Sequence, residues 1–488
     1  MKLLLIYPPR EHYIFGITPH VYVDCESGFY PPIGLMYLAA SIEKNSDWEV
    51  EIIDAYTEQY DFPALEAGIK KSKPDVVGIY FSTYYIYDPI LTAKIVKGIS
   101  KEIVVVAGGP HVALYPVETI KIQEIDYAVY GEGEFVFTEL LKEIQKNRKG
   151  TDGIPINLPG VLTKSNAGSP MKLQRIENLD GVPFPARHLS KYHLYKSILA
   201  KGSPITTIVS SRGCPFKCYF CSNLESGQKV RFRSAKNVVD EIHECVEKFG
   251  ITDFLFFDEL FTLKKERVVQ ICDEIDARGL KIHWHCRSRA DTLDREMVQK
   301  MKKAGCRLIQ FGIETGSQRL QKLINKNLNL EKVEENIKMV KSEGILTYAD
   351  FMFGLPSETD EESQMTLEYA KRIGIDYVVF GMFHPVPGSI FYDEGIGKRL
   401  FNDFWREIVN NPTEKIEDHS YTRKDRQKYE VLMSKAYREF YIRPRYLLQR
   451  LMHIDSVPQF IWQVKSGTKV FSKFLFEKTT AGMKRKGR

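Results

Sequence analysis

Three of the eight cysteines of this 488-residue chain lie close together, with the spacing Cys214-x3-Cys218-x2-Cys221. A strand-like run, Pro204–Ser210, comes directly before them, so the thiols belong to a loop at the end of a strand. A structural zinc site usually takes four ligands from paired C-x2-C halves, and the sequence has no second pair. Three thiolates from one short loop suit a 4Fe–4S cluster whose fourth iron stays open to a small molecule.

The elements that must position this loop are strands alternating with helices from residue 204 to about 390. Ser234 is a natural N-cap for one of the helices, predicted at Ser234–Phe249. Alternation of this kind forms a parallel sheet whose functional side chains lie at the carboxyl ends of the strands. Six strands are predicted, at Ile205–Ser210, Phe254–Phe257, Ile282–Arg287, Leu308–Gly312, Leu346–Phe353 and Tyr377–Phe383.

The cysteine spacing, with the aromatic Phe220 directly before the third cysteine, resembles the signature of the radical S-adenosylmethionine (SAM) superfamily. The resemblance implies a partial (β/α)6 barrel over residues 204–394 and a 4Fe–4S cluster on Cys214, Cys218 and Cys221. It further implies that SAM is cleaved to a 5′-deoxyadenosyl radical, with electrons from a reductant such as flavodoxin or ferredoxin.

Polar side chains at the predicted strand ends are the candidates that this resemblance gives for binding SAM. Asp258 and Glu259 are expected to accept from the amino group of SAM, or to cap the next helix instead. Arg287 is expected to pair with the SAM carboxylate, or with an acid of the barrel. The other candidates are Phe220 near the adenine, Ser288 and Glu314 near the ribose, and the glycine turn at Gly354.

Cys286 is the one remaining cysteine with a candidate catalytic position. It lies near the end of the third predicted barrel strand, where a side chain can face the substrate. Packing in the core is the favoured interpretation, because small buried thiols are common.

Residues 1–145 predict a separate doubly wound, Rossmann-like domain, because short β-branched runs again alternate with helical stretches. Ligands of such folds bind beyond the carboxyl ends of the strands. The strands are predicted at Leu3–Tyr7, Val50–Asp54, Val76–Ser82, Ile103–Ala107 and Tyr127–Tyr130.

This domain resembles the cobalamin-binding domain that precedes the barrel in one branch of the superfamily, through Ser82 and the later Gly108-Gly109 pair. The Asp-x-His-x-x-Gly motif, whose histidine binds cobalt in many such domains, is absent. His12 and His111 are conceivable replacements, although a lone loop histidine is more often simply solvated. The residues that the resemblance implies for cobalamin are Pro8, Ser82, Thr83, Gly108, Gly109, His111, Gly131 and Glu132.

Residues 146–203 are predicted to be a linker, and residues 395–488 a helical, basic C-terminal region. The chain carries a net charge of +6, and from Tyr441 onward eleven basic residues stand against two acidic ones. Apolar residues between Val457 and Phe476 follow a helical period, so this segment would dock on the barrel or lie on an anionic membrane surface. Nucleic acid is disfavoured as a partner, because no recognition motif accompanies the charge.

No signal peptide and no apolar run of about 18 residues occur, so the sequence predicts a cytoplasmic protein with at most peripheral membrane contact. The predicted function is cobalamin-dependent methylation of an unactivated carbon in a small or hydrophobic substrate. Two alternatives stay open. One is radical-mediated cyclisation or rearrangement in tetrapyrrole or lipid biosynthesis, and the other is a sensor or binding protein that holds cobalamin or the cluster without turnover.

Overall fold

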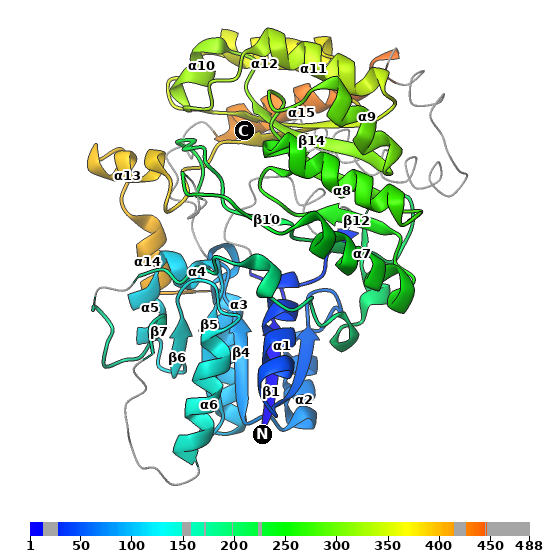
Figure 1. The fold of residues 1–488 in the computed structure, drawn as a ribbon. Helices are drawn as coiled ribbons and strands as arrows, with labels where there is room; N and C mark the ends of the chain where they lie inside the picture. Colours follow the sequence, from blue (N-terminus) through cyan, green and yellow to red (C-terminus); the bar gives the residue numbers. More distant parts are fainter. Residues whose placement is uncertain are drawn as a thin grey trace.

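The computed structural model describes residues 1–12, 28–148, 158–169, 172–197, 199–222, 227–413, 426–444 and 446. Its first part is a doubly wound domain (Figure 1). Five parallel strands have the order β3-β1-β4-β5-β6, and β7 (Val161–Leu162) adds antiparallel to the edge. The parallel strands are β1 (Lys2–Tyr7), β3 (Glu49–Asp54), β4 (Val76–Tyr80), β5 (Val104–Gly108) and β6 (Tyr127–Val129).

Helices cover both faces of this sheet, because its strands bury apolar side chains on both sides. Leu3 and Leu5 of β1 pack with α1 (Ile33–Asn45) and α6 (Val136–Arg148), whereas Leu4 and Ile6 pack in the core on the opposite face. Helices on that face are α2 (Phe62–Ser72), α3 (Tyr87–Ile99), α4 (Pro110–Leu114) and α5 (Pro116–Lys121). The predicted doubly wound fold is confirmed.

The second part is an open barrel of six parallel strands in the order β9-β12-β13-β14-β15-β16. The two edge strands, β9 and β16, do not pair with each other, so the barrel is partial, as predicted. The strands are β9 (Ile205–Ile208), β12 (Asp253–Phe256), β13 (His283–Ser288), β14 (Cys306–Glu314), β15 (Leu346–Phe353) and β16 (Tyr377–Met382).

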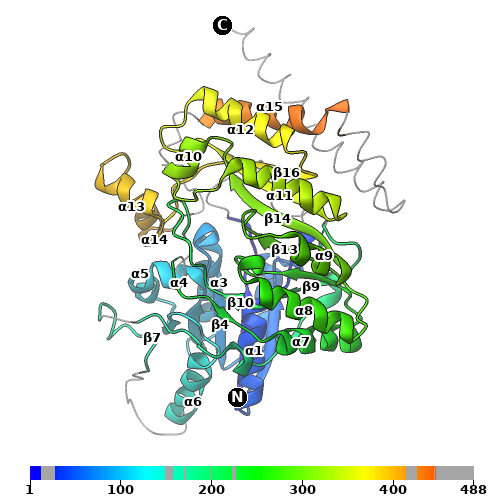
Figure 2. The same cartoon turned by 45° about the horizontal axis from the view of Figure 1, so that its top comes forward.

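Helices lie outside this sheet and share one large apolar core with its outward side chains (Figure 2). They are α7 (Ala235–Phe249), α8 (Lys265–Ala277), α9 (Arg295–Lys303), α11 (Leu330–Ser342) and α12 (Asp360–Arg372), with the short α10 (Gln318–Leu323) after β14. Ser234 caps α7 as predicted, since its side chain accepts from the backbone N–H of Asn237.

Tyrosines of α15 (Arg426–Tyr441) cover the exposed edge of β16. The Tyr437 hydroxyl bonds both the N–H and the C=O of Phe380, each at 3.1 Å, and Tyr441 does the same to Val378 at 2.9 and 2.8 Å. These hydroxyls replace the bonds that a seventh strand would make, which satisfies an otherwise unpaired edge.

The segment after the barrel returns to the first domain, which the sequence did not indicate. Phe404 and Trp405 of α14 (Phe404–Asn410) are buried in the same core as α2 and α3, and Trp405 meets Tyr84 edge-on at 5.6 Å. The short α13 (Ile390–Gly397) leads into α14. The amphipathic segment predicted at residues 457–476 lies outside the described residues. No helix within the described ranges has the length and apolarity needed to span a bilayer.

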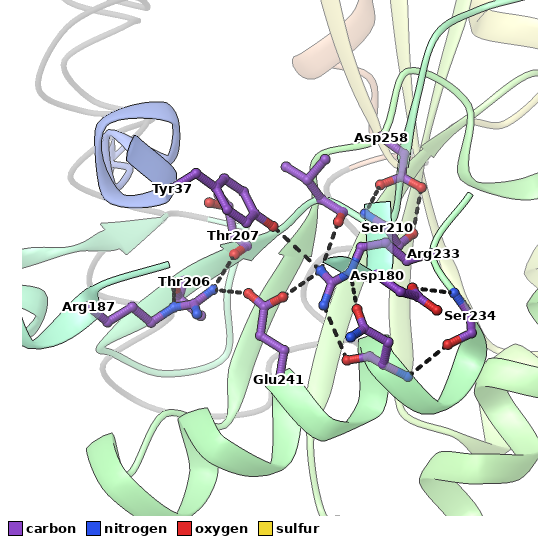
Figure 3. A network of polar contacts seen from close by, with 12 residues as sticks. Tyr37, Asp180, Arg187, Thr206, Thr207, Ser210, Arg233, Ser234, Glu241 and Asp258 are labelled. Atoms are coloured by element: carbon purple, nitrogen blue, oxygen red, sulfur yellow. Dashed lines mark hydrogen bonds and ion pairs between the residues drawn. The ribbon is translucent and has the colours of Figure 1, made fainter. Parts of the chain in front are cut away.

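A buried polar network joins the first domain, the linker and the barrel (Figure 3). Glu241 of α7, fully buried, pairs with Arg233 and, at 2.6 Å, with Arg187 of the linker. Arg187 also donates to the Thr206 hydroxyl at 3.0 Å, and Arg233 reaches the Tyr37 hydroxyl of α1 at 3.4 Å. Although burial raises the pKa of Glu241, the two guanidiniums bring it below its usual value.

Candidate functional site

The cysteine loop is closed at its base by a short hairpin. β10 (Ser211–Arg212) pairs antiparallel with β11 (Arg231–Phe232), so the three thiols project from the turn between them. The loop is also tied to the segment after α10, because Tyr219 N–H donates to the Ile324 carbonyl at 3.0 Å.

The three thiols of this loop are half-buried and free of disulfides. Within the described ranges, no three His, Cys, Asp or Glu side chains converge on a point where one metal ion would sit. Ligands of a cubane need not converge in this way, because each thiolate binds a different iron at its own corner. A donor set of three separated thiols therefore fits a 4Fe–4S cluster.

Two cations face the cysteine loop. Arg289 lies over the Phe216 ring at 4.1 Å and forms a bidentate pair with Asp291 at 2.8 and 2.9 Å. Burial raises the pKa of the Cys218 thiol, and the charges of Lys326 and Arg289 oppose that shift. Lys326 and Arg289 therefore favour the thiolate form that binds iron.

The two adjacent acids after β12 have different positions. Asp258 is buried, and its oxygens accept from the Ser210 N–H at 2.7 Å and from the Ser210 and Ser211 hydroxyls at 2.6 and 2.7 Å. Arg267 completes the set at 3.3 Å. Asp258 thus anchors the strand that leads into the cysteine loop. Glu259 is exposed, and its charge reaches Cys214.

Glu314 and Lys326 form a nearly buried ion pair beside the cysteines, with Lys326 Nζ 2.7 Å from Glu314 Oε1. Glu314 has a φ of 72° at an irregularity of β14, a strained conformation that often marks functional positions. Lys326 Nζ also lies 5.7 Å from the centre of the Phe220 ring. Phe220 itself packs against the apolar cluster of Leu355 and Phe383 at the barrel mouth.

A row of inward side chains crosses the barrel below this level. Arg287 pairs in register with Gln310, and Gln310 with Tyr348, while alternate residues such as Cys286 face the helices. Gln310 donates to Asp350 Oδ2 at 2.8 Å. Burial, the largest cause, raises the pKa of Asp350 to about 6.

Three of the candidate residues in the barrel are enclosed by other residues of the protein. Cys286 is fully buried against Cys306 in the core outside the sheet, which is the position that the favoured interpretation gave it, and not the substrate-facing position of the alternative. The Ser288 hydroxyl is buried and bonds Thr262 and the Arg289 carbonyl. Gly354 has a φ of 84°, and a side chain there would meet the Tyr429 ring at 3.2 Å.

A hollow opens at the carboxyl edge of the first sheet, between β1 and β4. This is the switch point of the strand order, where doubly wound folds bind their ligands. Arg10 lies there over the rings of Tyr7, Tyr56 and Tyr85, at 5.2, 4.3 and 4.9 Å. The lining residues are Tyr7, Pro8, Pro9, Arg10, Tyr80, Ser82, Tyr85 and Pro89.

The other candidates on this edge divide into open and enclosed positions. A side chain at Gly108 would meet nothing within 4 Å, so its backbone borders open space, whereas at Gly109 it would meet the Phe81 carbonyl at 2.8 Å. His111 is fully buried, Thr83 lies 3.0 Å from its Nδ1, and burial lowers its pKa to about 3. Such enclosure argues against His111 as a cobalt ligand. His12 Nδ1 lies 2.6 Å from the buried Asp88.

The loop after β6 joins the two domains. Glu132 lies 3.2 Å from Arg212 and 2.8 Å from Arg231, and Arg212 also pairs with Glu134 at 2.5 Å. Gly131 is needed for packing, since a side chain there would meet the Gln174 backbone at 2.5 Å. Because Arg212 comes two residues before Cys214, these ion pairs fix the carboxyl edge of the first sheet against the cysteine loop.

Known proteins match both halves of this arrangement. Residues 208–382 match the radical SAM superfamily, and residues 19–141 match the B12 binding domain. An uncharacterized methyltransferase of Pyrococcus horikoshii is 35% identical over 455 residues, which cover 92% of this chain and 94% of that protein. The chain belongs to the radical SAM enzymes that carry a B12-binding domain.

Two further relatives of this radical SAM enzyme differ in their reactions. Cytidylyl-2-hydroxyethylphosphonate methyltransferase of Streptomyces wedmorensis is 30% identical over 73% of this chain and 76% of that protein. Anaerobic magnesium-protoporphyrin IX monomethyl ester cyclase of Rubrivivax gelatinosus is 30% identical over 75% of this chain and 67% of that protein.

Solved structures share the fold of this radical SAM enzyme. The radical SAM methyltransferase TsrM of Kitasatospora setae, determined with cobalamin and a 4Fe–4S cluster bound, gives a TM-score of 0.63 at 21% identity, covering 82% of this chain and 78% of that one. The cobalamin-dependent radical SAM enzyme OxsB gives 0.68 at 15% identity, covering 98% and 71%.

Sequence reasoning missed several residues of this radical SAM enzyme's site. Arg289 is separated from Arg287 by one residue, and strand alternation alone does not say which arginine meets the cysteines. Lys326 follows a short helix, Asp350 lies within β15, and Arg10 follows a double proline. None of them directly follows an apolar strand-like run, which is the pattern that identified the other candidates. Only their neighbours in space make them candidates.

Proposed function

We propose that this radical SAM enzyme methylates an unactivated carbon of a small-molecule substrate. Cys214, Cys218 and Cys221 would hold a 4Fe–4S cluster, SAM would bind at the barrel mouth, and cobalamin at the edge of the first sheet. When bound, the cluster with SAM supplies a radical that abstracts hydrogen, and cobalamin supplies the methyl group. The observation that carries the proposal is the Arg212 junction, whose ion pairs with Glu132 and Glu134 hold the carboxyl edge of the first sheet beside the cysteine loop.

The chain's own residues divide the work at the barrel mouth. The cysteine loop would present three thiolates, and the charge of Arg289 favours this form at Cys214 and Cys218, as that of Lys326 does at Cys218. Glu259, whose charge reaches Cys214, would accept from the amino group of SAM, and Glu314, held by Lys326, would accept from its ribose. Phe220 offers an apolar surface to the adenine, and the turn at Gly354 borders the same cluster. Together these contacts orient SAM and exclude water.

Cobalamin would occupy the edge of the first sheet above Pro8, Ser82 and Gly108, where the hollow and the open backbone lie. Arg10 is held in place by its three tyrosines and keeps a positive charge at the floor of that site. An external reductant such as flavodoxin or ferredoxin would supply electrons.

The test is anaerobic reconstitution with iron, sulfide and hydroxocobalamin, followed by dithionite and SAM. Methylation predicts bound cobalamin, 5′-deoxyadenosine and S-adenosylhomocysteine together. Cyclisation, the reaction that the Rubrivivax relative's name describes, predicts 5′-deoxyadenosine without S-adenosylhomocysteine, and a sensor predicts SAM that binds but is not cleaved. Cys218→Ala should lose iron and SAM cleavage, whereas Cys272→Ala, in the outer core, should keep both.

A further inference from the structure

Arg287 is a partly buried cation that has no polar partner among the residues that the structure describes. Its Nε is enclosed without a hydrogen bond, and in the part of the chain that the structure describes its guanidinium makes no ion pair. The guanidinium carbon lies 4.7 Å from the centre of the Phe257 ring. A charge withdrawn from water without a partner is costly, so a position of this kind is retained when a ligand completes it.

The surroundings of Arg287 form one side of a binding site. Phe257, directly after the carboxyl end of β12, is 43% exposed, so part of this side chain that Arg287 leaves uncovered is accessible to a ligand. Gln310 stands between Arg287 and Tyr348 in the row, and the charge of Arg287 acts on Tyr348, on Asp350 and on Tyr30 of the first domain. A cation, an open aromatic face and a phenol therefore converge inside the barrel.

Arg287 lies deeper in the barrel than the cysteine loop, where SAM would bind, so its ligand is expected to be a molecule other than SAM. The charges that act most on Cys214 and Cys218 include Arg289 and not Arg287. Arg287 lies within β13 and Arg289 directly after its end, so Arg287 is two residues earlier, about 6 to 7 Å along an extended chain. SAM bound at the cysteines would lie above this level, and the substrate must approach from the space that remains.

We propose that Arg287 binds an anionic oxygen group of the substrate, a carboxylate or a phosphate-type group, while the apolar part of the substrate lies against Phe257. This inference rests on the proposed function and narrows its substrate class to anions. A guanidinium suits the proposed role because its planar fork can donate two parallel bonds to either kind of group.

The test uses calorimetric titration of the reconstituted protein, loaded with cobalamin and SAM and kept without reductant. The probes are phenylphosphonate and phenylacetate as anions, and benzyl alcohol as the neutral analogue. Both anions should bind more tightly than the alcohol, and the tighter of the two identifies the group. Arg287→Gln should weaken the preferred anion by about tenfold or more, as expected for lost charge-assisted bonds, and leave the alcohol unaffected.

Two further variants control this experiment. Arg287→Lys keeps the charge without the fork and should bind the anion with intermediate affinity. Arg307→Gln removes a cation near the amino end of β14 and should leave anion binding within twofold of the native protein. A thermal scan checks folding, and Arg287→Gln should melt no lower than the native protein, because it removes an unpaired charge from a partly buried position.

Equal binding of anions and alcohol overturns the inference, as does a loss of SAM affinity in Arg287→Gln that matches or exceeds the loss of anion affinity. The second result would indicate that Arg287 binds the carboxylate of SAM. Neither result touches iron content, 5′-deoxyadenosine or S-adenosylhomocysteine, so this inference and the proposed function fail separately.

Discussion

The seam between the domains and the interior of the barrel each contain an arginine withdrawn from solvent, Arg233 and Arg287, but within the described residues only Arg233 has polar partners. Arg233 donates to Glu241, Asn237 and the Val209 carbonyl, with Tyr37 at the limit of hydrogen bonding (Figure 3). Arg287, fewer than 60 residues later, has an aromatic ring against it and no ion pair within the described ranges.

The difference separates charges that hold the fold from charges that await a ligand. A buried ion pair with all its bonds is close to neutral in free energy but becomes strongly destabilising when one member is removed. An unpaired charge is destabilising from the start, and a protein keeps it at a position where a ligand supplies the partner. The two regions differ less in how deeply the arginine is buried than in whether its N–H groups have hydrogen-bond acceptors.

The largest expected effect breaks the seam. Glu241→Gln removes the shared carboxylate and leaves the guanidiniums of Arg187 and Arg233 without their counter-charge. We expect a loss of about 3 to 5 kcal/mol in the free energy of unfolding, measured by chemical denaturation. Asp240→Asn, at the partly exposed neighbouring position, should change it by less than about 1 kcal/mol. A small loss in Glu241→Gln would contradict the structural role of the network.

In the barrel interior, removing a charge should increase the free energy of unfolding, whereas in the seam it decreases it. Because burial raises the pKa of Asp350 to about 6, its folded form binds the proton more tightly than the unfolded chain does. The resulting stability is complete below about pH 4 and is lost as the pH rises through about 6.

Asp350→Asn avoids the cost of the ionised carboxylate. We expect it to be more stable than the native protein at pH 8, by up to about 3 kcal/mol, with the difference disappearing near pH 4. Thermal unfolding of the apoprotein at several pH values measures the effect. A variant less stable at pH 8 would show that Asp350 is held by partners, as Glu241 is.

Neutral hydrogen bonds at the barrel edge should have a smaller effect. Tyr437→Phe keeps the ring that packs at 5.5 Å on Phe380 and removes the two bonds to the β16 backbone. We expect a loss of about 1 to 2 kcal/mol in the free energy of unfolding. Hydrogen exchange of the Phe380 amide should increase in the variant, and unchanged exchange would mean that the edge is protected in another way.

The smallest effect should come from a solvent-accessible ion pair between the first domain and the segment after the barrel. Arg406 of α14 pairs with Glu118 of α5, and half of the Arg406 side chain is exposed to solvent. Glu118→Gln should change the free energy of unfolding by less than about 1 kcal/mol, and the change should shrink further in high salt. If Glu118→Gln lost as much unfolding free energy as Glu241→Gln, burial would not explain why the seam network is the more important of the two.

The strand–helix alternation was readable in the sequence because parallel strands are short apolar runs that leave a periodic signal. All eleven strands predicted for the two large sheets are present, from β1 (Lys2–Tyr7) to β16 (Tyr377–Met382). Ser234 was predictable as an N-cap because capping depends on residues only three positions apart. The cysteine loop was likewise identifiable, since its three donors are local.

The sequence alone thus determined the two sheets, the loop that carries the thiols, and the family that this loop indicates. Only the tertiary structure decided that Asp258 is enclosed while Glu259 is exposed, that Cys286 faces the helices, and that Glu132 ties the domains together. It also decided that Arg287 lacks, among the described residues, the carboxylate partner that Arg233 has in Glu241. The physical reason is that a side chain's role depends on which groups meet it in space, and those groups come from distant parts of the chain.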